Sequence, residues 1–73
     1  DDFDRAFIEG MIVHHEDAIE MARLSNENAK HDEIQRLSEA IIVTQQKEID
    51  QMNQWRVDWG YGARSSNEES MTH

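Results

Sequence analysis

In the first half of the chain, apolar side chains recur every three or four residues, the spacing that places them on one face of an α-helix. The stripe consists of Phe7, Met11, His14, Ala18 and Met21, and it is widened by Ile8, His15, Ile19 and Ala22. Proline is absent, and Gly10 is the only glycine before residue 60. We therefore expect a helix over residues 3–28, with two adjacent histidines on its buried face.

A second stripe follows a break at residues 28–31. Asp32 is suited to cap a new helix, and Gln35 is placed to reach back toward it in a capping-box arrangement. The stripe consists of Ile34, Leu37, Ile41, Gln45, Glu48, Met52, Trp55 and Trp59. Gln45 and Glu48 are its only polar members. The spacing predicts a second helix over residues 32–59.

Gly60 and Gly62 end the second stripe, and the residues after them show no periodicity. The sequence therefore predicts one helical domain over residues 1–60 and a flexible polar tail over residues 61–73. Because the two helices have similar lengths and a short connection, the predicted fold is all-α, an antiparallel two-helix hairpin.

Equal heights in such a hairpin follow from the helical rise of about 1.5 Å per residue, which makes the numbers of facing residues sum to about 60. His14 and His15 then lie near the level of Glu48. At the open end of the hairpin we expect an aromatic plug within the core, formed by Phe3, Phe7, Trp55 and Trp59.

The chain is short for a self-sufficient core, because domains under about 70 to 80 residues rarely gain more than about 3 to 5 kcal/mol from one core. Two helices alone are expected to leave four isoleucines partly uncovered: Ile8, Ile12, Ile19 and Ile42. We therefore expect a homodimer in which a second hairpin completes a four-helix bundle.

Composition narrows the choice of partners. Sixteen acidic residues against seven basic ones give a formal charge of -9, which repels nucleic acids and anionic lipid headgroups and attracts cations. No apolar run is long enough for a membrane span, so we expect no membrane insertion. No signal peptide is visible. Because cysteine is absent, a site for a soft metal has to use methionine sulfur.

The two stripes place potential metal ligands at similar heights: Met11, His14, His15, Glu48 and Met52. Imidazole suits copper, and thioether sulfur selects soft ions such as Cu(I), for which Ag(I) is a plausible mimic. Gln45 and Met21 are expected to support these ligands from the next layer. His14 and His15 differ by about 100° around the helix axis, so one ligates within the hairpin while the other faces a partner.

A metal-free interpretation remains open at this point. Methionines on a helical stripe commonly fill the core. A hydrogen bond between Glu48 and His14 or His15 would satisfy these polar groups without any ion. Under this interpretation the chain is a structural oligomerisation module whose buried His-Glu contacts fix the register of its helices.

The sequence lacks several catalytic motifs. His15-Glu16 begins like the zinc-protease motif, but Ile19 occupies the position of its second histidine. No glutamate lies three residues before a histidine, as a di-iron carboxylate bundle requires. No serine adjoins His14 or His15, and an oxidase using bound copper or iron has no support in the sequence. We therefore expect a binding protein and not an enzyme.

The combined string M-x-x-H-H-x-x-A-x-x-M-A from Met11 to Ala22, preceded by Phe3 to Gly10, resembles the opening of the bacterial domain of unknown function 305 family. The second stripe, with Ile34, Glu48 and Met52, is similar to that family's second helix. The resemblance covers almost all of residues 2–59.

This resemblance implies a ferritin-like helical fold in which the Met, His and Glu cluster is the shared site. It also implies an extracytoplasmic location, periplasmic, secreted or at the cell surface, and a link to copper or silver binding. Metal binding thereby moves ahead of the metal-free interpretation.

Overall fold

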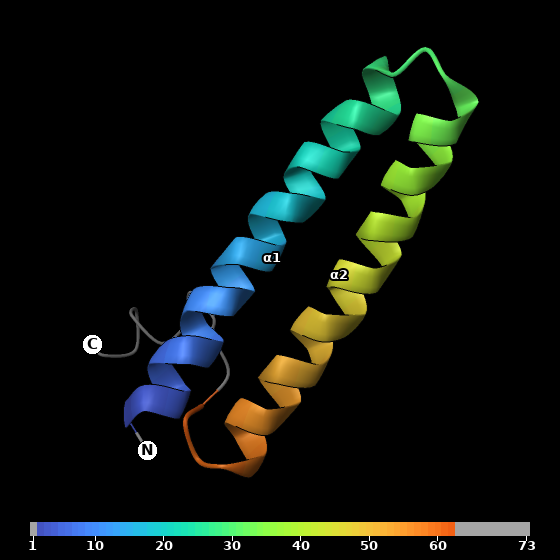
Figure 1. The fold of residues 1–73 in the computed structure, drawn as a ribbon. Coiled ribbons are helices and arrows are strands. Elements are labelled where there is room, and N and C mark those ends of the chain that lie inside the picture. The colour runs from blue at the N-terminus through green and yellow to red at the C-terminus, as the bar shows by residue number, and fades with distance from the viewer. Residues whose placement is uncertain (1, 63–73) are drawn as a thin grey trace.

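The computed structural model describes residues 2–62, which form two helices, α1 (Asp2–Asn28) and α2 (Asp32–Asp58). The helices lie side by side and run in opposite directions, so that the start of α1 and the end of α2 share one end of the hairpin (Figure 1). The predicted all-α antiparallel hairpin is confirmed, with helix ends within one residue of the prediction. Of the tail predicted over residues 61–73, residues 63–73 lie outside the described residues.

The core lies between the two helices and is formed by Ile8, Ile12, Ile19, Ile49 and Met52. The expectation that isoleucines of α1 would be partly uncovered is therefore wrong, whereas Ile42 is half-buried. The buried stripe of α1 is centred about one residue later than predicted. Phe7 and Met21, predicted to be buried, are 55% and 71% exposed. The reason is that the apolar sector of α1 is wider than the strip that a single neighbouring helix covers.

Facing residues are also displaced along α2. Ser38 of α2 donates a hydrogen bond to Ser25 of α1 at 2.8 Å, and His15 faces Glu48. If the numbers of facing residues summed to about 60, as expected from the sequence, Ser25 and His15 would instead face residues about one helical turn earlier in α2. The difference arises because the connection turns near His31 and Asp32 and not at Lys30.

The start of α2 differs from the predicted capping box. The N-cap residue is His31, whose side chain makes no capping hydrogen bond. Gln35 does reach back, but its Nε2 donates to the carbonyl oxygen of Ala29 at 2.8 Å. The acidic residues Asp32 and Glu33 lie in the first turn, where the helix dipole favours negative charge.

The end of α2 is a Schellman motif. The N–H of Tyr61 donates to the carbonyl oxygen of Arg56 at 2.7 Å, and the N–H of Gly60 donates to that of Val57 at 3.3 Å. Gly60 has a φ of 82°, in the left-handed region that favours glycine. Tyr61, which follows this glycine, is half-buried against the core.

Beside the core, the two helices share a second apolar surface, which we call the open face. It carries Phe7, Ala18 and Met21 from α1, and Ile34, Leu37, Ile41, Trp55 and Trp59 from α2. The predicted aromatic plug lies at one end of this face. Phe3 stacks on Phe7 and Trp55 on Trp59. These rings are not core in a single hairpin, because all of them are more than a third exposed.

Two glycine substitutions are expected to change the free energy of unfolding in opposite directions. Gly10 lies within α1 and a Cβ there would meet nothing within 4 Å, so Gly10→Ala gains about 1 kcal/mol through helix propensity. Gly60→Ala forces an L side chain into the left-handed region and loses about 1 kcal/mol. Urea unfolding followed by circular dichroism measures the two changes in free energy. If both variants were stabilised, or both destabilised, this account would be contradicted.

Candidate metal centre

His15 is held between the two helices by both of its ring nitrogens. Its side chain is 10% exposed. Nδ1 donates to the carbonyl oxygen of Met11, one turn earlier, at 2.7 Å. Because a carbonyl oxygen can only accept, the proton lies on Nδ1, and Nε2 is turned toward α2. There Nε2 lies 2.5 Å from Oε1 of Glu48.

Glu48 reaches the buried ring from a half-exposed position, with 53% of its side chain accessible. Oε1 is used by His15, whereas the other carboxylate oxygen makes no hydrogen bond to any residue between 2 and 62. With a proton on Nε2, the pair is a charge-assisted hydrogen bond between the helices. Without that proton, Nε2 and the carboxylate are both electron-pair donors that a cation can share.

His14 is exposed and lies away from this pair. Its ring centroid is 6.2 Å from that of His15, with 64° between the ring planes. Within the part of the chain that the structure describes, no three His, Asp or Glu side chains converge as a metal site would require. One hairpin thus brings together two of the predicted nitrogen and oxygen ligands, His15 and Glu48, and leaves the third on its surface.

The methionines predicted as ligands lie in the apolar layers around this pair. Met52 is 7% exposed within the core, and the half-buried Met11 packs against the same cluster. Of the two predicted supporting residues, Gln45 is half-buried, whereas Met21 is exposed at the rim of the open face. The thioethers of Met11 and Met52 therefore contribute packing in this arrangement.

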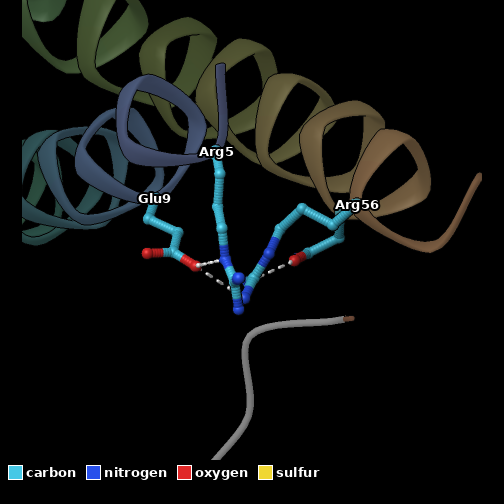
Figure 2. Close-up of polar contacts among 4 residues, drawn as sticks. Arg5, Glu9 and Arg56 are labelled. Atoms are coloured by element: carbon cyan, nitrogen blue, oxygen red, sulfur yellow. Dashed lines mark hydrogen bonds and ion pairs between the residues drawn. The ribbon is translucent and has the colours of Figure 1, made fainter. Parts of the chain in front are cut away.

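Sequence reasoning missed a second polar cluster, at the open end of the hairpin. Glu9 accepts from Nε of Arg5 at 3.3 Å and lies 3.6 Å from Nη2 of Arg56 (Figure 2). Arg56 is only 2% exposed, its Nη1 donates to Asn53 at 3.4 Å, and its Nε has no hydrogen-bond partner. The signal that the sequence offered for the burial of Arg56 was its position four residues, about one helical turn, after Met52.

The family described as Domain of unknown function (DUF305) matches residues 1–73. Searches of curated proteins and of solved structures gave no match. Between residues 2 and 62, neither helix combines the length and apolarity needed to cross a bilayer. Because the family match extends over the full sequence, the chain belongs to the DUF305 family.

Proposed function

We propose that this protein binds a soft transition-metal ion, Cu(I) or its mimic Ag(I), at the centre of the hairpin. The observation that carries the proposal is the hydrogen bond from His15 Nδ1 to the carbonyl oxygen of Met11. Imidazoles that bind metals are commonly fixed through their second nitrogen in this way, which leaves the other nitrogen free to ligate. Nε2 of His15 is aimed at Glu48, a further oxygen ligand.

The ligands would come from His15, Glu48 and the two thioethers of Met11 and Met52, with His14 beside them. Thioether and imidazole together favour Cu(I) and Ag(I) over harder ions. A bound cation would replace the proton shared by His15 and Glu48. The net charge of -9 favours the approach of any cation.

In this proposal the protein acts as a binder and not as an enzyme, because the sequence lacks the zinc-protease and di-iron spacings and places no serine beside His14 or His15. We further propose that it works outside the cytoplasm, as a homodimer that forms a four-helix bundle. The location rests on the family resemblance. The dimer rests on the exposed aromatic and aliphatic residues of the open face.

Titration of the metal-free protein with Cu(I), Ag(I) and Zn(II) tests the function. We expect the two soft ions to bind more tightly than Zn(II), and Met11→Leu to weaken them because it keeps the volume but removes the sulfur. X-ray absorption of the Cu(I)-loaded protein should show sulfur scattering that diminishes in this variant. If Cu(I) were coordinated by nitrogen and oxygen atoms alone, with no change in Met11→Leu, Met11 would contribute only to packing.

One observation favours a second candidate function. The contact between His15 and Glu48 already satisfies a buried imidazole without any ion, as expected for a metal-free oligomerisation module whose polar pair fixes helix register. If the protein binds none of the three ions, and if Glu48→Leu changes its oligomeric state, the metal-free module would be favoured over the metal site.

A further inference from the structure

The open face has apolar residues at both ends and a polar group at its middle. A cavity of about 210 Å³ lies at one end, bordered by Phe7, Trp55 and Trp59. A second, of about 230 Å³, lies toward the loop, bordered by Met21, Ile34, Leu37 and Ile41. Between them, His14 falls midway between Phe7 and Met21 along α1.

Glu48 occupies the matching position on α2. It lies seven residues from both Ile41 and Trp55, and therefore on the same side of the helix. The polar centre of the open face thus consists of His14 from α1 and the half-exposed side chain of Glu48 from α2.

The size of the open face suits a second copy of this chain. A helix of 27 residues is about 40 Å long, and packed helices lie about 10 Å apart. Two such helices present on the order of 800 Å² to a partner, the area that each side of a standard stable interface contributes. Glu16 and Glu20 border a separate polar cavity and stay outside this surface.

Two symmetric arrangements can cover the face, and they differ in what meets at the centre. With both loops at the same end, α1 of each copy packs on α2 of the other at equal height. His14 of one copy then faces Glu48 of the other, because heights within the hairpin are set by the contact of His15 with Glu48.

With the loops at opposite ends, like helices pack together instead. The midpoints of α1 and α2 lie close to His15 and Gln45, so His14 then meets His14, and Glu48 meets Glu48. Placing like charges against each other in an interface costs several kcal/mol. Charge complementarity therefore favours loops at the same end.

We propose that a second copy covers the open face with both loops at the same end, and that His14 of each copy completes the metal site with His15 and Glu48 of the other. Glu48 then uses Oε1 for His15 of its own chain and its free oxygen toward the second copy. The dimer brings together the three nitrogen and oxygen ligands that a single hairpin separates. This inference rests on the metal-binding function proposed above.

Complementation between variants tests the shared site. His14→Ala and Glu48→Ala, each alone, should lose most Ag(I) binding. A refolded equal mixture should recover about one quarter of the wild-type sites, because half of the dimers are mixed and each of these holds one intact site. Binding by the wild type without recovery in the mixture would overturn the shared site while leaving the proposed function standing. Failure of the wild type to bind Ag(I) would overturn both.

A second mixture is the matched control. In His15→Ala with Glu48→Ala, no mixed dimer holds His15 and Glu48 on one chain, so this mixture should recover no binding. If this mixture recovered as much Ag(I) binding as the first mixture, His15 and Glu48 of one site would not have to come from the same chain, which would contradict the proposed site.

Thiol cross-linking tests the arrangement without any metal, since the natural chain has no cysteine. Met21 and Ile41 border one cavity and so lie at the same height. Mixed Met21→Cys and Ile41→Cys chains should form a cross-linked dimer with a short bifunctional reagent. Mixed Met21→Cys and Phe7→Cys chains should not, because Phe7 lies near the other end. The reverse result would establish loops at opposite ends, and no cross-link in either mixture would rule out the second copy.

Discussion

Substitution of Ile12 by alanine is expected to lower the free energy of unfolding by about 3 kcal/mol. Ile12 is 1% exposed and lies within the single buried cluster between α1 and α2. Truncating a buried isoleucine removes its transfer free energy and leaves a cavity, which together cost about 2 to 5 kcal/mol. Ile12 belongs to the buried cluster that joins α1 to α2 within each hairpin, so this variant should be largely unfolded at moderate urea concentrations.

The neighbouring residue provides the matched control. Val13 is 41% exposed, so Val13→Ala removes little buried surface and gains helix propensity. We expect its free energy of unfolding to stay within about 0.5 kcal/mol of the wild type. Urea titrations of both variants at one protein concentration measure the difference. Similar losses for the two variants would contradict the assignment of the stability to the interhelical core.

Substitution of His15 is expected to have the largest effect on metal binding. His15 is the one histidine of the described residues that is buried and paired with a carboxylate. Losing even a residue that only orients a ligand costs about 10- to 100-fold in metal affinity. We therefore expect His15→Gln, which keeps a hydrogen-bonding side chain for Glu48, to weaken Ag(I) binding by about 100-fold or more.

His31 serves as the control for this measurement. It is exposed at the start of α2 and its side chain makes no capping hydrogen bond. His31→Ala should leave Ag(I) affinity within about twofold of the wild type, because no ligand or supporting contact is removed. Isothermal titration of both variants, with circular dichroism to verify helicity, gives the comparison. Equal losses would point to nonspecific binding of Ag(I) by histidines.

The polar centre illustrates how much of the site the sequence could provide. The spacing of the apolar stripes predicted that a histidine of α1 and Glu48 would lie at one height. It left open whether His14 or His15 is the partner, since both adjoin the apolar face. The structure pairs His15 with Glu48. The pairing depends on how α1 is rotated against α2, and rotation is set by packing.

The sequence by itself determined the two helices, their ends to within a residue, and their antiparallel pairing, because these follow from local periodicity, from glycine placement and from a short connection. Only the tertiary structure decided which side of the wide apolar sector is buried. A single partner helix covers the isoleucine side, which leaves Phe7 and Met21 outside. The burial of Arg56 against Glu9 was likewise a tertiary result, since an arginine on a stripe is buried only where the packed helices provide a carboxylate and cover its stem.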